Sequence, residues 1–217
     1  MTVRSSLTST RPLASFGGVT ESAPAHLDPA YQSALIVSAA LNFAMFLFEG
    51  GAGLIVGSAA LLADAVDFIE DATIFSLAVV AIGWSARARG RAGLLQGFTM
   101  AGVGFAAIAA IVHRLFVGGA PNGPSVGIVA FTALAVNVYC AYRLARFTRG
   151  DSSMRAIWLS SRNDAILNVI TILAAGVIVF TRSAWPDIIV GGLIAAINLW
   201  AAGEVLLTAT RELKISN

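Results

Sequence analysis

One short stretch of this apolar chain carries four carboxylates within eight positions, and carboxylates are side chains that bind divalent cations. Asp64, Asp67 and Asp71 are separated by three and four residues, and Glu70 lies among them. Residues three and four apart stack on one face of a helix. If the stretch is helical, we therefore expect Asp64, Asp67 and Asp71 to present oxygen atoms along one face.

A second stretch carries polar side chains at every fourth position. Ser160, Asp164 and Asn168 fall on one helical face, whereas Arg162 and Asn163 lie on the same turns and are expected to point elsewhere. A hydroxyl, a carboxylate and an amide again offer oxygen atoms. The two stretches together hold enough of these groups to build one cation site.

Clustered carboxylates repel one another unless a cation lies among them or some of them are protonated. Binding of a metal to carboxylates displaces protons, so these two states are the ones between which a metal–proton exchanger alternates. A different interpretation is a polar patch that joins helices through hydrogen bonds. Such patches need one or two polar residues, so four acids on one helix favour a function.

The composition places most of the chain in lipid. Of its 217 residues, 57% are hydrophobic and 12% are charged, against about 25% charged in soluble domains. The mean hydropathy is +0.80. At about 20 residues for each membrane-spanning helix, the chain has room for about six spans. An ionised carboxylate within such a span costs roughly 2.5–3.5 kcal/mol and normally marks function.

Six apolar runs separated by turn residues predict an all-α membrane protein with six transmembrane helices. The first run ends at Glu49 and is followed by a glycine-rich link over 50–53; a basic loop over 87–91 follows the second run. The division into domains is a flexible cytoplasmic tail over 1–30, a transmembrane domain over 31–210 and a short cytoplasmic tail over 211–217. The predicted helices cover about residues 33–48, 59–84, 94–117, 126–144, 156–180 and 188–207.

Basic residues concentrate on one side of this topology, the side that holds both termini. Only Arg114 and Arg182 fall on the other side. Basic loops face the cytoplasm, so both termini are expected to be cytoplasmic, in a bacterial inner membrane. With basic residues at span ends, a net charge of +2 does not indicate nucleic acid. The residues on the basic side are Arg4, Arg11, Arg87, Arg89, Arg91, Arg143, Arg146, Arg149, Arg155, Arg211 and Lys214.

The topology also brings the two polar faces to a similar depth. The second helix runs inward and the fifth runs outward, and the mismatch between Asp71 and Asp164 is about 6 Å at 1.5 Å per residue. Asp67, Asp71 and Asp164 are therefore expected to converge, together with either Ser160 or Asn168. Glu49 either lines this cavity, contributes to a second cation site, or reaches from a helix end to the interface.

Residues 49–71 resemble the first two helices of the cation diffusion facilitator family, whose members are metal cation–proton antiporters. The resemblance rests on a Glu that ends the first helix, a Gly and a Ser in the link, and Ala-Leu-Leu-Ala-Asp-Ala at 60–65 followed by Asp67-x-x-x-Asp71. Residues 158–168 take the place of the family's second ligand motif. The resemblance extends over roughly residues 33–210 and implies that family's six-helix bundle.

The resemblance implies that Asp67, Asp71 and Asp164 bind the metal. The family's fourth ligand position falls on Ser160, which departs from the usual His or Asp; Asn168 or a water molecule is the alternative. Family members commonly carry a cytoplasmic domain after the sixth helix, and this chain stops soon after that helix. A homodimer is therefore expected to form through the membrane helices.

We expect a secondary transporter that exports a divalent transition-metal cation in exchange for protons, with the metal as substrate, no cofactor and no enzymatic reaction. Oxygen ligands favour Mn, Fe or Co, and Zn also accepts carboxylates. Mg fits less well because it dehydrates reluctantly. The alternatives are a proton-coupled exporter of small organic cations, and a non-transporting membrane subunit in which the acids only pair with Arg162.

Overall fold

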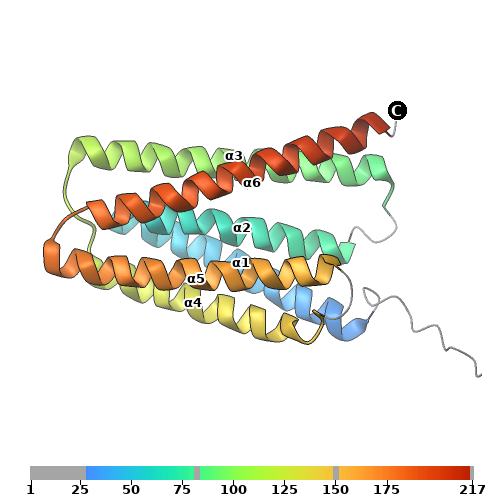
Figure 1. Ribbon diagram of the computed structural model, residues 1–217, viewed down its shortest axis with the longest axis horizontal. Helices are drawn as coiled ribbons and strands as arrows, with labels where there is room; N and C mark the ends of the chain where they lie inside the picture. The colour runs from blue at the N-terminus through green and yellow to red at the C-terminus, as the bar shows by residue number, and fades with distance from the viewer. Residues whose placement is uncertain (1–27, 81–83, 149–151, 216–217) are drawn as a thin grey trace, which may run out of the picture.

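The computed structural model describes residues 28–80, 84–148 and 152–215, and this part of the chain consists of six α-helices (Figure 1). The tail predicted over 1–30 lies almost entirely outside the described residues. The helices are α1 (Pro29–Val56), α2 (Ala59–Val80), α3 (Ala86–Val117), α4 (Gly123–Ala145), α5 (Ser152–Thr181) and α6 (Trp185–Ile215).

The helices run alternately up and down, so the links between them gather at two ends. One end holds the start of α1 and the end of α6, and we call it the terminal end. The other end, which we call the opposite end, holds the α1–α2, α3–α4 and α5–α6 links. Helix α2 therefore begins at the opposite end, and α5 begins at the terminal end.

Five of the described helices are long and apolar enough to cross a membrane by length and composition: α1, α3, α4, α5 and α6. Helix α2 has 22 residues, which also suffices, but it carries the four carboxylates. Within the described residues, α2 is also the helix that contacts all five others. This interior position keeps its acids away from lipid and confirms the predicted all-α membrane bundle of six helices.

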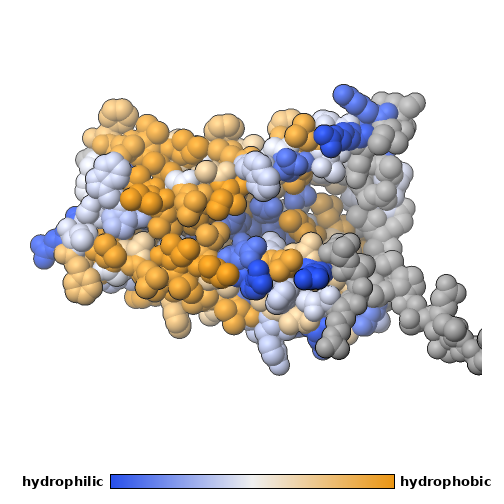
Figure 2. All heavy atoms as spheres, in the orientation of Figure 1, coloured by the Kyte–Doolittle hydropathy of each residue, from blue (hydrophilic) through white to orange (hydrophobic). Residues whose placement is uncertain are grey.

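The exterior of the bundle is apolar over most of its length. Large hydrophobic side chains face outward on several helices; Ile55, Phe116 and Phe180 are each at least 87% exposed. Figure 2 shows hydrophobic residues over most of the visible face, with hydrophilic ones toward the terminal end and in a hollow between α5 and α6. Such a surface suits lipid outside and a polar site inside.

The bundle consists of two units. Helices α3 and α6 pack along each other, and among the described residues the backbone of α3 comes close only to α2 and α6. Helices α1, α2, α4 and α5 form the second unit, in which α1 pairs with α2 and α4 pairs with α5. The α3–α6 pair is joined to this unit through contacts of α2 with both of its helices and of α5 with α6.

The predicted link at residues 50–53 is wrong, because α1 continues through it to Val56. The helix ends instead at Gly57, whose φ of 67° is a left-handed conformation that glycine adopts readily. A Cβ atom at Gly53 would lie 3.0–3.1 Å from Leu62, so glycine permits α1 to approach α2 closely there. Packing of α1 against α2 thus outweighs the low intrinsic helix propensity of glycine.

The predicted basic loop at 87–91 is also wrong, because these residues form the first turns of α3. Ser85 caps this helix by accepting a hydrogen bond from the Ala88 amide at 3.2 Å. At the other extreme of the chain, α6 continues into the segment predicted as the tail 211–217, as far as Ile215. Helices that span a membrane can extend past their apolar segments, so the apolar runs underestimate their length.

The two ends of the bundle are packed differently. Near the opposite end, small side chains of α2, α3, α5 and α6 meet in one cluster, with Ala63, Ala107 and Ala195 each at most 1% exposed. Near the terminal end, larger residues such as Leu35 and Phe75 join α1, α2, α4 and α5, and this cluster includes no residue of α3 or α6. The α3–α6 pair therefore packs tightly on its neighbours at the opposite end.

We predict that Gly191→Ala destabilises the protein by about 1–3 kcal/mol. A Cβ atom there would lie 2.7–2.8 Å from backbone atoms of Ala59 and Ala60, which cannot turn aside as a side chain can. The measurement is thermal unfolding of the detergent-purified protein. Gly192→Ala is the matched control, because a Cβ atom at this position meets nothing within 4 Å. This substitution also removes a glycine, which weakens a helix. Equal unfolding temperatures for the two variants would contradict the close contact between α2 and α6.

Candidate functional site

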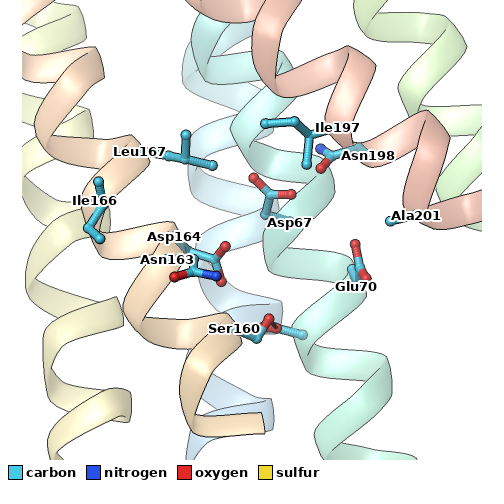
Figure 3. A pocket seen from close by; sticks show the side chains of 11 residues that line it. Asp67, Glu70, Ser160, Asn163, Asp164, Ile166, Leu167, Ile197, Asn198 and Ala201 are labelled. Atoms are coloured by element: carbon cyan, nitrogen blue, oxygen red, sulfur yellow. Dashed lines mark hydrogen bonds between the residues drawn. The ribbon is translucent and has the colours of Figure 1, made fainter. Parts of the chain in front are cut away.

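A cavity of about 370 Å³ lies between α2, α5 and α6, in the middle of the bundle. Carboxylate, hydroxyl and amide groups face it from all three helices (Figure 3). The apolar part of the wall comes from α5 and α6. The lining residues are Asp67, Glu70, Asp71, Ser160, Asn163, Asp164, Ile166, Leu167, Ile197, Asn198 and Ala201.

Asp71 and Asp164 connect α2 to α5 in this cavity. Asp71 is 2% exposed, and its two carboxylate oxygens accept hydrogen bonds from Ser160 at 2.9 Å and from Ser161 at 3.5 Å. The half-buried Asp164 carboxyl lies within hydrogen-bonding reach of Asp71. The two helices thus bring together a pair of acids that are 93 positions apart in the sequence.

Asp67 lies one turn further toward the opposite end, and its carboxylate has fewer hydrogen-bond partners than that of Asp71. It is 8% exposed, and its Oδ2 atom has no hydrogen-bond partner among the described residues. Asn198 of α6 lies beside it in Figure 3, and the Asn198 amide nitrogen donates to the Ala63 carbonyl oxygen at 3.2 Å. An unpartnered carboxylate oxygen facing a polar cavity is available to a ligand.

The structure separates the two candidates for the fourth ligand position. Ser160 lines the cavity and donates to Asp71. Asn168 is fully buried and does not line the cavity; its amide nitrogen donates to the backbone oxygen of Asp164 at 3.0 Å. Of these two residues, only Ser160 therefore lies where it could share a ligand with Asp71.

Asp64 and Glu49 lie outside the cavity. Both are fully buried, and apart from each other their carboxylate oxygens have no hydrogen-bond partner within the described parts of the chain. The two carboxyl groups face each other across the contact between α1 and α2. Glu49 therefore neither reaches the membrane interface nor lines the cavity with the other acids.

Three polar groups of the cavity were not predicted from the sequence. Asn163 was expected to point away, and this is wrong because it lines the wall. Glu70 also lines the wall, although the helical spacing had singled out its neighbours. Asn198 went unnoticed, and its only signal is a polar residue in the middle of the apolar stretch of α6.

Arg162 does not neutralise the acids of α2. Its guanidinium lies over the Trp158 ring, 5.4 Å from the ring centroid, and donates to Asn163 at 3.2 Å. The arginine is exposed, so its charge faces away from the cavity. Hydroxyl groups of α5 thus bind Asp71, and this arginine forms no ion pair with the acids.

The carboxylates are close but not drawn into one coordination sphere. Within residues 28–80, 84–148 and 152–215, no three His, Cys, Asp or Glu side chains are gathered as a ready-made metal-binding group. Like charges keep carboxylates apart. Binding a cation would therefore require Asp67, Asp71 and Asp164 to move toward one another, or to share the ion with hydroxyl and amide oxygens.

Two further cavities continue from the site toward the terminal end. The first adjoins it at Ser160 and is lined by α2, α3 and α5; the second meets the first at Leu77 and Gln96 and reaches Glu204 on α6. They follow the boundary between the α3–α6 pair and the other four helices. This boundary is thus hollow on the terminal side of the acids, whereas the small-residue cluster fills it on the other side.

Comparisons with known proteins agree with this architecture. Residues 35–214 match the family model of the cation efflux transmembrane domain. The chain is 29% identical over 192 residues to the zinc transporter ZitB of Yersinia pestis, and 28% identical to the ZitB of Yersinia pseudotuberculosis. Each match covers 82% of this chain and 62% of the relative, so the chain spans less than two thirds of the length of these relatives.

The family match includes α2 and α5, the two helices that carry the acids. It covers well over half of the chain and agrees with the resemblance found at residues 49–71. The chain therefore belongs to the cation efflux family, also known as the cation diffusion facilitators.

Proposed function

We propose that this chain is a secondary transporter that moves a divalent transition-metal cation out of the cytoplasm in exchange for protons. The observation that carries the proposal is one cavity inside a membrane bundle, with three aspartates from two helices on its wall. Asp67, Asp71 and Asp164 bind the ion, and Ser160 and Asn198 complete the ligand set. Family membership supports cation efflux as the general activity.

Proton exchange follows from the chemistry of the ligands. A carboxylate binds a metal only when it is deprotonated, so the ion and the protons compete for the same oxygens. Four acids in the membrane interior cannot all remain charged without a cation among them, because the desolvation and repulsion costs add. The site therefore holds either a metal ion or protons, which is the condition for obligatory exchange.

Zinc is the first candidate for the metal. The two relatives are named zinc transporters, and zinc accepts carboxylate ligands. The cavity contributes oxygen atoms and no imidazole or thiolate from the described residues, which also suits Mn, Fe and Co. We propose a site that takes several of these ions and prefers zinc less strongly than a histidine-containing site does.

The wall of the cavity argues against an organic cation as substrate. Sites for organic ammonium ions use aromatic faces, and the described side chains that line this cavity include none. The non-transporting alternative relied on Arg162 as the partner of the acids, and that arginine instead stacks on Trp158. Both observations favour a metal ion.

The cavities between the α3–α6 pair and the other four helices support a conformation that is open toward the cytoplasm. In our proposal the terminal end faces the cytoplasm of a bacterial inner membrane, because that end carries most of the basic residues. The cavities that continue toward it would then admit the ion from the cytoplasm. We also propose a homodimer held by membrane helices, which the mass of the detergent-purified protein tests.

We predict that Asp71→Asn and Asp164→Asn each reduce metal flux by at least tenfold, since each removes a charged ligand and keeps the side-chain shape. Even the loss of a group that only hydrogen-bonds to a metal ligand lowers metal affinity or activity by about 10–100-fold. The measurement is zinc-dependent fluorescence in proteoliposomes. Asp28→Asn is the control, because this exposed residue only caps α1 and an amide oxygen can still accept the bond from Ala30. If both cavity variants carried zinc as well as the control, the site assignment would be wrong.

We also predict that Ser160→His shifts the preference of the protein toward zinc over manganese, because imidazole suits zinc better than manganese. Calorimetric titration of purified protein with each metal measures this preference. Asn168→His is the comparison, since Asn168 does not line the cavity. A shift in the Asn168 variant alone would reverse the choice between the two positions.

A further inference from the structure

Asp187, in the first turn of α6, is a fully buried carboxylate at the opposite end of the bundle. It accepts hydrogen bonds from the Ala59 amide at 2.7 Å, from the Ala60 amide at 3.3 Å and from the Ser58 hydroxyl. All three donors belong to the beginning of α2. A residue of α6 thus supplies the cap of another helix, 128 positions away from Ala59.

With this cap, the first amide groups of α2 have hydrogen-bond acceptors. The first amide groups of a helix have no partners within it. Asp187 accepts from two of them, and the Ser58 hydroxyl accepts from a third, that of Leu61, at 3.2 Å. A carboxylate at a helix N-terminus is also favoured by the helix dipole. Because Asp187 is fully buried, separating it from α2 would leave a charge and two amides unpaired.

Two further contacts close the same end. Gly191, one turn after Asp187, lies against the backbone of Ala59, where no Cβ atom would fit. On the other helix of the pair, Arg114 of α3 donates to the Val56 carbonyl oxygen at the end of α1, at 3.3 Å. Both helices of the α3–α6 pair are therefore tied to the α1–α2 link by specific polar bonds.

The acids of the cavity lie between this closed end and the hollow terminal half. Moving the α3–α6 pair away from α2 at the opposite end would open a route to the acids from that side. Such a movement must break the bonds of Asp187, because they join the two units directly. Once the end is open, water can solvate both the carboxylate and the helix end, so the separation is reversible.

We propose that Asp187 is the latch of the outer gate: its cap on α2 holds the opposite end closed while the ion binds, and its release accompanies outward opening. The inference rests on the proposed transport function, because it assumes that the site alternates between two sides. It assigns Asp187 a positioning role without contact to the ion.

Accessibility of a cysteine beneath the latch tests the proposal. Val190, three residues after Asp187, is 7% exposed and belongs to the small-residue cluster. Val190→Cys is introduced with Cys140→Ala, which removes the native thiol. A membrane-impermeant thiol reagent is then applied separately to each face of membrane vesicles that contain the full chain, without added metal, and the labelling rate of the introduced thiol is measured.

We expect Asp187→Ala to raise labelling of this introduced thiol from the outer face by about tenfold or more. The loss of hydrogen bonds to a buried charge shifts the equilibrium between the closed and the open opposite end by at least this factor. Ser58→Ala removes one of the three bonds of Asp187, together with the bond that the Leu61 amide donates to Ser58, and is expected to give a smaller rise. Ser183→Ala is the matched control. It removes a cap within α6 itself, the bond from the Trp185 amide at 3.2 Å, without touching α2, and is expected to leave the rate unchanged.

Unchanged labelling in Ser58→Ala, or in a folded Asp187→Ala protein, would overturn the latch. So would an equal rise in Ser183→Ala. If Asp187→Ala fails to fold, Ser58→Ala decides the question, since it keeps both amide bonds of Asp187. Zinc flux of the protein without these changes is measured in parallel, so a failure of the transport proposal is seen separately from a failure of the latch.

Discussion

The presence of four carboxylates on one membrane-embedded helix, three of them buried and Glu70 half-buried, is the constraint on which this structure depends. A charged side chain cannot face lipid without a large cost. Helix α2 therefore occupies the interior, in contact with the five other described helices. The remaining helices present their apolar side chains outward, and the serines of α5 and Asn198 of α6 are brought to the acids. The polar cavity follows from the need to surround α2.

The acids of this helix lie between a closed half and an open half of the bundle. On one side of the acids, alanines and Gly191 let α3 and α6 pack closely against α2. On the other side, cavities separate the α3–α6 pair from its neighbours. Tightly packed interfaces shift between discrete arrangements and do not deform continuously. This asymmetry is the form expected of a protein in which one pair of helices rocks about a fixed site.

Local patterns predicted the number of helices and the meeting of Asp71 with Asp164, because apolar runs and four-residue spacing survive folding. They did not predict the helical state of residues 50–53, where close packing of α1 on α2 overrides the weak propensity of glycine. Asn198 and Asp187 also escaped prediction. Each acts through a partner more than 120 residues away, and nothing in their local sequence reveals that partner.

We propose that the acids of α2 and α5 bind a divalent cation. Anomalous X-ray scattering from crystals of the protein grown with zinc or manganese tests it most directly. We expect one peak in the cavity between α2 and α5, with oxygens of Asp67, Asp71 and Asp164 at about 2.0–2.2 Å from it. Metal bound elsewhere on the chain, with no peak among these three residues, would contradict it.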